Sequence, residues 1–361
     1  MMSATITRDE KAVRLLKELI SIPSISGQED ATATAIEQYL KCEGVKDVNP
    51  HLNNVWAVNA HYTPVKPSVL LCSHHDTVRA VEGYTRDAHS PVEEDGRLYG
   101  LGSNDAGGAL VSLIETFLYF YDRVDLEYNL ILTAVAEEER SGAGGLTAIL
   151  PLLPPYEFAI VGEPTGMKMA VAEKSLLVVD CVSRGVSGHA ARSEGDNAIY
   201  HAIEDIAALK NYRFERVSPT LGEVHMNVTM VNAGTQHNVI PSTCSYVIDI
   251  RPTDVYTNEE IMETICSIIK AEATPRNMRR RASSIPVTHP IVVAGVEMGL
   301  EMFGSPTLSD QALLSCPSLK IGPGESARSH TADEYIEINE LKEGLDIYIS
   351  LLSKILEEKK Q

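Results

Sequence analysis

The sequence predicts an α/β protein of two domains, in which the smaller domain is inserted into the larger one. Its 361 residues exceed the length at which one hydrophobic core usually stops growing. Over the first half of the chain, apolar strand-like runs alternate with helical runs, as in a largely parallel sheet covered on both faces. In such sheets the functional residues gather at the carboxyl ends of the strands.

Two helices and two strand–helix steps are predicted before the insertion. Residues 9–21 and 29–44 repeat apolar side chains at a helical period, and Gly44 favours the end of the second helix. Residues 68–76 then predict a buried strand that ends in polar residues. The alternation continues with a helix (107–121), a strand ending in acidic residues (129–139), a short helix (144–150) and a strand entering a turn (156–164).

A change of pattern after residue 171 predicts the inserted domain. Its elements follow the order β-α-β-β-α-β, the ferredoxin-like arrangement, and Asn197 is placed to cap its first helix. We expect the insertion at 172–281, between the two parts of the larger domain at 1–171 and 282–361. In the insertion, strands are expected near 176–183, 224–232, 244–251 and 279–287, and helices at 197–210 and 258–272. The segments 292–304, 317–324 and 339–358 then complete the larger domain.

Composition and charge exclude several classes of protein. Hydrophobic residues at 44% and charged residues at 22% are typical of a globular protein, and the net charge of −19 argues against nucleic-acid binding through a basic surface. The N-terminus lacks an apolar signal segment, and no apolar run approaches the roughly 20 residues that span a bilayer. These features predict a cytoplasmic protein without a membrane partner. Scattered cysteines predict free thiols at Cys42, Cys72, Cys181, Cys244, Cys266 and Cys316.

His74 and Asp76, at the end of the first buried strand, are the first candidate site residues. Imidazole is the commonest nitrogen ligand of zinc, and a carboxylate two residues further on can orient the ring through its other nitrogen. The same triplet also occurs in ordinary surface turns, so the motif alone does not decide between the two readings.

Three further segments carry carboxylates. Asp105 lies among glycines that let the backbone approach a ligand closely, although its position also fits a cap for the next helix. Glu137–Glu139 follow a strand apolar enough to be central, where adjacent carboxylates repel one another unless water or a cation neutralises them. Glu163 ends another apolar strand, and its alternative is a loop acid before a proline turn.

His330 adds a second histidine far along the chain. Two histidines and several carboxylates from five separate segments suit a pair of zinc-class ions that share one bridging carboxylate, about 3.5–4 Å apart. A structural zinc site would favour clustered cysteines instead.

Seven segments resemble, in order, the signatures of the M20 metallopeptidase and deacylase family. The resemblance runs from about Leu71 to Glu334 and implies a zinc-exopeptidase-like α/β/α catalytic domain with an inserted lid and dimerisation domain. In length and in its ending the chain is similar to acetylornithine deacetylases and their relatives that act on N-acyl-citrulline and N-acyl-lysine. The segments are SHHDTV, YGLGSNDAGG, AEEERSGAGG, GEPT, GVSGHAARSEGDNAI, QHNVIPSTCSYVIDIR and GPGESARSHTADEY.

The resemblance implies a role for each candidate residue. Five residues would bind two Zn²⁺ ions, with Co²⁺ as an alternative, and Asp105 would bridge the two ions. Asp76 would support His74 without binding metal, and Glu138 would be the general base. The implied ligands are His74, Asp105, Glu139, Glu163 and His330.

The resemblance also implies roles for the inserted domain. His189 would reach the active site of a partner subunit and stabilise the oxyanion, so a homodimer through the lid is expected. Asn238 and Arg251 would hold the carboxylate of the substrate, and a loop with Gly322 and Gly324 would face it.

Three positions depart from the pattern of the family. Leu101 stands where the family commonly has Arg, and Gly107 stands where it has Lys. Neither is an implied ligand. The Pro usual after the lid histidine is also replaced, near Ser193.

The implied activity is removal of an N-acyl group, acetyl or succinyl, from an amino acid such as N-acyl-L-ornithine or N-acyl-L-citrulline in arginine biosynthesis. Succinyl-diaminopimelate desuccinylase and M20 dipeptidase are the alternatives of the same chemistry. A non-catalytic binding protein on this scaffold is the third, and lost ligands would mark it. Arg79 and Arg192 are candidates for contact with a second acid group, although ordinary exposed arginines fit the sequence too.

Overall fold

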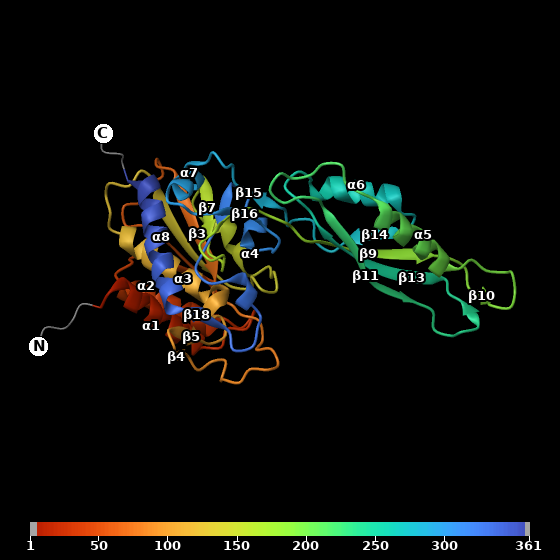
Figure 1. The fold of residues 1–361 in the computed structure, drawn as a ribbon, viewed down its shortest axis with the longest axis horizontal. Coiled ribbons are helices and arrows are strands. Elements are labelled where there is room, and N and C mark those ends of the chain that lie inside the picture. Colours follow the sequence, from red (N-terminus) through yellow and green to blue (C-terminus); the bar gives the residue numbers. More distant parts are fainter. Residues whose placement is uncertain (1–5, 358–361) are drawn as a thin grey trace, which may run out of the picture. The chain divides into compact units, whose positions relative to one another are not determined.

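The computed structural model describes residues 6–357, which form two compact units (Figure 1). Residues 1–5, which carry part of the expectation that the chain lacks a signal segment, lie outside the described residues. Within the described part, no helix is both long and apolar enough to cross a membrane. The larger unit takes its described residues from Met1–Val171, Ile285–Phe303 and Ser309–Gln361, and the smaller one from Ala172–Ser284 and Gly304–Leu308.

A nine-stranded sheet organises the larger unit. Its central strands, in the order β6-β3-β7-β17, run parallel as expected, and every residue of β3 and β6 is buried, as parallel strands covered on both faces require. The sheet has the order β1 (Val48–His51), β2 (Asn54–Val58), β6 (Asn129–Val135), β3 (Ser68–His74), β7 (Phe158–Val161), β17 (Ser318–Lys320), β8 (Met169–Glu173) and β15 (Ser283–Ser284), and β16 (Met302–Ser305) pairs with β8.

Outside these central strands the sheet has antiparallel pairs, so the prediction of a largely parallel sheet holds for its centre. β1 pairs antiparallel with β2, β2 with β6, and β8 with β17. A two-residue hairpin at Leu52 and Asn53 joins β1 to β2, and so short a connection permits only antiparallel neighbours.

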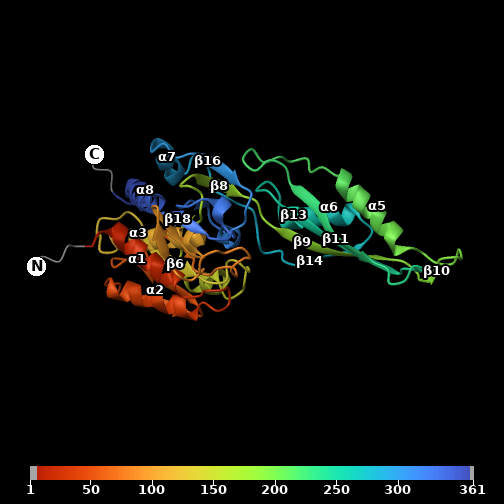
Figure 2. The ribbon, with the colours of Figure 1, turned by 60° about the horizontal axis from the view of Figure 1, so that its bottom comes forward.

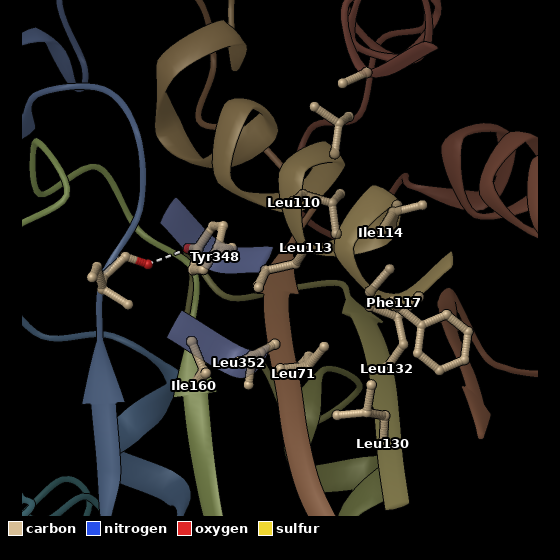
Figure 3. Close-up of a cluster of buried hydrophobic side chains, with 14 of the residues drawn as sticks. Leu71, Leu110, Leu113, Ile114, Phe117, Leu130, Leu132, Ile160, Tyr348 and Leu352 are labelled. Carbon is tan, nitrogen blue, oxygen red and sulfur yellow. Dashed lines mark hydrogen bonds between the residues drawn. The ribbon is translucent and has the colours of Figure 1, made fainter. Parts of the chain in front are cut away.

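Helices cover both faces of the sheet. On one face lie α1 (Arg8–Ile20), α3 (Gly108–Phe120) and α8 (Ile338–Leu356). Figure 3 shows Leu113 of α3 packed towards Leu71 of β3 and Phe117 towards Leu132 of β6. The alternate strand residues, such as Leu70, face a second cluster with α4 (Leu146–Ile149), which continues into the short helix η2 (Leu150–Leu152). Burying one such leucine or phenylalanine stabilises the fold by about 1.5–3 kcal/mol.

The parallel arrangement brings the predicted site segments to one edge. In the register of the sheet, His74 pairs with Val135 and Cys72 with Val161, so β3, β6 and β7 end at nearly the same level. The turns that follow these strands carry Asp76, Glu138 and Glu163.

A small three-stranded sheet positions the remaining site segments. It consists of β4 (Val92–Glu94), β5 (Arg97–Tyr99) and β18 (Tyr335–Glu337), with Tyr335 paired to Tyr99. Because β5 leads into the turn η1 (Ser103–Gly107) and β18 follows residues 330–334, this pairing places His330 beside the turn of Asp105. The other helices of the larger unit are α2 (Asp30–Cys42), α7 (Pro290–Glu297), η3 (Asp310–Leu313) and η4 (Ser326–Arg328).

The smaller unit contains a four-stranded antiparallel sheet with two helices on one face (Figure 2). Asn197 caps the first helix, as predicted, by accepting a hydrogen bond from the backbone N–H of Ile199. A two-stranded ribbon of β10 (Gly188–His189) and β12 (Val239–Ile240) adjoins it in sequence. In chain order the elements are β9 (Leu177–Arg184), α5 (Ala198–Asn211), β11 (His225–Ala233), β13 (Thr243–Arg251), α6 (Asn258–Ile268) and β14 (Glu272–Pro275), and the sheet order is β11-β13-β9-β14.

The prediction of the last inserted strand near 279–287 is wrong. The fourth strand is β14, immediately after α6, where Ala273 pairs with Cys181 of β9. Ser283 and Ser284 instead form β15, which pairs with β8. The apolar pattern of 258–272 predicts a longer helix, whereas α6 ends at Ile268 and leaves residues 272–275 free to pair with β9.

Candidate metal centre

Asp105 lies between the two candidate histidines. Its Oδ1 is 3.4 Å from Nε2 of His74, and its Oδ2 is 3.6 Å from Nε2 of His330. The two oxygens of one carboxylate therefore face two different imidazoles, which is the arrangement expected of a bridging ligand. The peptide bond between Asp105 and Ala106 is cis.

His74 and Glu163 form one side of the centre. His74 is the last residue of β3 and is 1% exposed, and its Nε2 is 3.9 Å from Oε1 of Glu163. Its other nitrogen, Nδ1, lies 3.0 Å from the backbone oxygen of Asp76, which orients the ring.

His330 and Glu139 form the other side. Nε2 of His330 is 3.0 Å from both carboxylate oxygens of Glu139. His74, Asp105 and Glu139 each offer one possible ligand atom, and these three atoms all lie within 4.8 Å of one another. His330 is half exposed, so this side of the centre is open to solvent.

Asp76 fixes the acidic turn after β6. Its two oxygens accept hydrogen bonds from the backbone N–H groups of Glu138 and Glu139, at 3.0 and 3.1 Å, and the hydroxyl of Ser26 also donates to it. Burial alone would raise its pKa, but these bonds and the neighbouring His74 outweigh burial and lower it to about 2. Asp76 is therefore an anion that holds two candidate site residues in place.

The three glutamates of the acidic triplet, Glu137–Glu139, point to different surroundings. Glu137 has a left-handed backbone (φ +58°), accepts a hydrogen bond from the backbone N–H of Gly144 and pairs with Arg140 at 2.6 Å. Glu138 is near enough to His74 and Glu163 for their charges to shift its pKa. Only Glu138 and Glu139 of the triplet therefore face the centre.

The loop with Gly322 and Gly324 lies beside Glu163. Backbone and side chain of Thr165 exchange hydrogen bonds with Gly322, and a Cβ at Gly322 would lie 2.5 Å from the backbone oxygen of Glu163. Gly324 has φ +88°, and a Cβ there would lie 2.5 Å from Oδ1 of Asn104. Glycine is thus required at both positions, by close approach at the first and by backbone conformation and approach at the second.

The centre holds more negative charge than its own residues neutralise. Burial and neighbouring carboxylates raise the pKa of Glu138 well above its usual range, and burial, with the charge of Asp105, raises the pKa of Glu163 to about 8. The hydrogen bond with Glu139 raises the pKa of His330 to about 9. Burial lowers the pKa of His74, but bonds to Asp105 and Asp76 outweigh it and raise the pKa overall.

This donor set fits divalent cations. Imidazole and carboxylate ligands suit zinc-class ions, and two ligands on one tetrahedral zinc lie roughly 3.3–3.4 Å apart, close to the spacings around Asp105. A cation on each side would neutralise part of the negative charge of the carboxylates. The five implied ligands therefore form a candidate metal centre.

The candidate residues of the smaller unit fall at its two ends. His189 pairs with Val239 in the ribbon, and the backbone N–H of Ala190 donates to the backbone oxygen of Asn238, so His189 and Asn238 are neighbours. Arg251 is the last residue of β13, whose nine residues span roughly 25–30 Å from the ribbon end. The structure does not bring Arg251 to the other two.

Arg79 and Arg192 are both exposed. Arg192 lies in the turn after His189, where its backbone N–H donates to the backbone oxygen of His189, and its side chain is 4.0 Å from Glu194. Nothing in the contacts of either arginine distinguishes it from an ordinary surface residue.

Asn104 and Glu334 also contribute to the centre, although the sequence does not single them out as site residues. Asn104 joins the turn of Asp105 to the glycine loop, because its side chain both donates to and accepts from the backbone of Glu325. Glu334 is 2% exposed and accepts three backbone hydrogen bonds from the turn of Asp105. Both residues lie within segments that resemble the signatures of the family, which is the one sequence feature that could indicate them. Their hydrogen-bond partners depend on the geometry of loops, which a residue pattern does not show.

The comparison with family models decides the family. The model described as peptidase family M20/M25/M40 matches residues 70–354, most of the chain. The chain belongs to the M20 family. As an M20 member it is a hydrolase, and the family resemblance inferred from its motifs is confirmed.

Curated relatives of this M20 chain include two acetylornithine deacetylases. The protein of Edwardsiella ictaluri (strain 93-146) is 29% identical over 90% of this chain and 92% of its own length. The protein of Shigella sonnei (strain Ss046) is 28% identical over 94% of this chain and 96% of its own length.

Solved structures show the same fold as this M20 chain. The aminopeptidase PepT from Bacillus cereus ATCC 10987 has a TM-score of 0.75 at 17% identity and covers 97% of this chain and 100% of its own. The YXEP protein of Bacillus subtilis, described as a dinuclear metal-binding peptidase of the family, has a TM-score of 0.70 at 18% identity and covers 96% and 98%. The α/β/α fold class of the larger unit is confirmed.

Proposed function

We propose that this chain is a two-zinc hydrolase that removes an N-acyl group from an amino acid such as N-acyl-L-ornithine or N-acyl-L-citrulline, in arginine biosynthesis. The observation that carries the proposal is the carboxylate of Asp105, whose two oxygens face two different histidines. The acetylornithine deacetylases at 28–29% identity support the acyl-amino-acid substrate. Six unpaired cysteines fit the reducing cytoplasm as its compartment.

The proposed ligands divide into two sets that share Asp105. His74 and Glu163 would hold one ion, and Glu139 and His330 the other. When bound, two such ions lower the pKa of a water molecule and polarise the acyl carbonyl of the substrate. The protein itself supplies the base, the orientation of the ligands and the contacts to the substrate.

Glu138 is the proposed general base. Its backbone N–H is held by Asp76, and its carboxylate is near enough to His74, Glu163 and Glu139 for their charges to shift its pKa. It would remove a proton from the attacking water and later deliver that proton to the departing amine. Because Asp76 also holds the backbone of Glu139, the base and its neighbouring ligand keep a fixed spacing.

His189 is the proposed oxyanion donor. The backbone N–H of Ala191 donates to its Nδ1 at 3.1 Å, so a neutral His189 carries its proton on Nε2. The exposed Nε2–H is then free to donate to a developing oxyanion, a contribution typically worth a few kcal/mol. The family resemblance favours a partner subunit as the acceptor of this contact.

Arg251 and Asn238 are proposed to hold the carboxylate of the substrate, together with the loop of Gly322 and Gly324. Because they lie at opposite ends of the smaller unit, the two residues at one site would come from two copies of the chain. Arg251 already pairs through Nε and one terminal nitrogen with Asp249, at 2.9 and 3.2 Å. Its second terminal nitrogen would make the contact to the substrate, with Asp249 fixing the plane of the guanidinium.

The smaller unit is proposed as a lid and as the contact surface of a homodimer. Tyr200 and Ile203 on α5 are 67% and 56% exposed, and Met230 and Val231 on β11 are also exposed. β11 is an edge strand of its sheet. Exposed apolar side chains next to an open strand edge are typical of a surface that another chain covers.

Metal analysis combined with a substrate panel tests the proposal. We expect two metal ions per chain and hydrolysis of acetyl- or succinyl-ornithine or of the corresponding citrulline derivatives. Preferred hydrolysis of a dipeptide or of succinyl-diaminopimelate would replace the proposed substrate. Metal-free protein that binds N-acyl amino acids without hydrolysing them would contradict the catalytic role.

A further inference from the structure

We propose that Glu334 is a positioning residue that holds the backbone of the Asp105 turn, so that both oxygens of Asp105 can serve two cations at once. This inference rests on the proposed function, because it assigns the device that keeps the bridging ligand in place. The residue touches neither substrate nor metal in this role.

The hydrogen bonds of Glu334 converge on the turn that carries Asp105. Oε1 accepts from the backbone N–H groups of Asn104 and Asp105, both at 2.9 Å, and Oε2 accepts from that of Gly102 at 3.1 Å. The backbone oxygen of Glu334 also accepts from the N–H of Gly100 at 3.0 Å. One buried side chain thus satisfies three donors that precede α3 and need partners.

The turn needs an external anchor because its own sequence is permissive. Gly100 and Gly102 precede Asp105, Gly102 adopts φ +76°, and Asp105 itself is non-helical at φ −118° and ψ 101°. Glycines leave such a segment many conformations in the absence of contacts. Three hydrogen bonds to one rigidly buried carboxylate remove that freedom.

The anchor also joins the two halves of the centre. Glu334 lies four residues after His330, and β18 begins directly after it. A shift of Glu334 would therefore move Asp105 and His330 relative to each other. Displacements of about 1 Å at such sites are enough to cost roughly 10²-fold in rate.

Asp333 provides a matched comparison next to Glu334. Its Oδ1 accepts from the backbone N–H groups of Thr85 and Arg86, at 2.9 and 3.1 Å, and its Oδ2 accepts from the hydroxyl of Thr85 at 2.6 Å. It therefore makes the same number of hydrogen bonds, but to a loop that carries no candidate ligand.

Amide substitutions separate the two positions. In Asp333→Asn, the amide oxygen can accept both backbone bonds and the NH₂ group can donate to the hydroxyl of Thr85, so all three contacts survive. In Glu334→Gln, the oxygen can still accept from Asn104 and Asp105, but the NH₂ group meets the N–H of Gly102, donor against donor. The third contact is lost in a buried site.

Titration of metal-stripped protein with Co²⁺, followed by calorimetry and by the visible spectrum, tests the proposal. We expect two ions per chain for the wild type and for Asp333→Asn. For folded Glu334→Gln we expect one or both ions to bind roughly 10- to 100-fold more weakly, the range seen when a group behind a ligand is altered, with a changed spectrum.

The outcomes distinguish this inference from the proposed function. Wild-type affinity and spectrum in folded Glu334→Gln would overturn the positioning role, even if its thermal stability were lower. Failure of the wild type to bind Co²⁺ would instead overturn the metal centre itself. If Glu334→Gln does not fold, Glu334→Asp replaces it, because its shortened carboxylate cannot reach all three donors, and wild-type binding there would equally overturn the role.

Discussion

Three adjacent glutamates at the end of β6 take three different parts. Glu137 turns away to pair with Arg140 and with the N–H of Gly144. Glu139 contacts His330, and Glu138 is near enough to His74 and Glu163 for their charges to shift its pKa. The left-handed backbone of Glu137 and the two bonds from Asp76 to the next two residues produce this division. Glu137 can therefore serve as a control for substitutions of Glu138 and Glu139.

Substitution of the proposed base separates chemistry from metal binding. Glu138→Gln should keep the metal content and lose about 10²- to 10⁴-fold in kcat, because the amide cannot accept the proton of the water. Glu137→Gln, one residue away, should keep a near wild-type kcat, since its carboxylate faces Arg140. Metal analysis and steady-state kinetics measure both. A near-normal rate in Glu138→Gln would assign the base to another residue.

Glu115 offers a pH-dependent test away from the centre. Burial raises its pKa above the usual 4.5, although hydrogen bonds from Tyr39 and Arg8 oppose that rise. Because the folded state then binds the proton more tightly than the unfolded state, this residue favours folding at low pH and opposes it as the pH rises through the raised pKa. Glu115→Gln should therefore raise Tm at pH 8 by roughly 2 °C and by less at pH 5.

Thermal unfolding at the two pH values checks this prediction. Glu18→Gln, on the exposed side of α1, is the control and should change Tm little at either pH. A lower Tm for Glu115→Gln at pH 8 would show that its bond with the half-exposed Arg8 matters more than its burial.

At the scale of elements, the candidate ligands come together because β3, β6 and β7 are parallel neighbours that end at one level. The segments at 102–105 and 322–334 then close the site through Asn104 and Glu334 rather than through regular structure. Gly324 lies at the first of these links.

Alanine at Gly324 tests the fit of the glycine loop. The left-handed backbone should cost about 1–2 kcal/mol, and the new Cβ, 2.5 Å from Oδ1 of Asn104, should add to that cost and raise KM. Gly44→Ala is the control, because Gly44 also has positive φ (+93°) but nothing within 4 Å of its Cβ. Urea unfolding and kinetics compare the two. Equal losses of stability with an unchanged KM would contradict the role of the loop.

The sequence predicted the elements that follow simple patterns. Buried strands show as continuous apolar runs, and the residues at their ends have chemically specific side chains, so His74 and Glu163 could be singled out. The contacts of Asn104 and Glu334 could not, because they are made with backbone groups whose positions depend on turns far apart in the chain. β14 was misplaced because Glu272–Pro275 has no alternating apolar pattern of its own.

At the scale of the whole molecule, each unit has a hydrophobic core of its own, and the candidate residues are divided between them. The larger unit carries all five proposed ligands, and the smaller one carries His189, Asn238 and Arg251. His189 and Arg251 lie at opposite ends of the smaller unit, so a single copy of this unit cannot easily bring both residues to the same site. A second copy of the chain removes this difficulty.

Disruption of the proposed dimer surface tests this division. Ile203→Glu places a charge on the exposed apolar face of α5 and should convert a dimer into monomers, as measured by light scattering. The monomers should keep their metal content and Tm but lose most of their kcat, because His189 would no longer reach a partner's site. Val65→Glu, at a position 87% exposed in the larger unit, is the control and should remain dimeric and active. A wild type that is monomeric and fully active would show that each chain completes its own site.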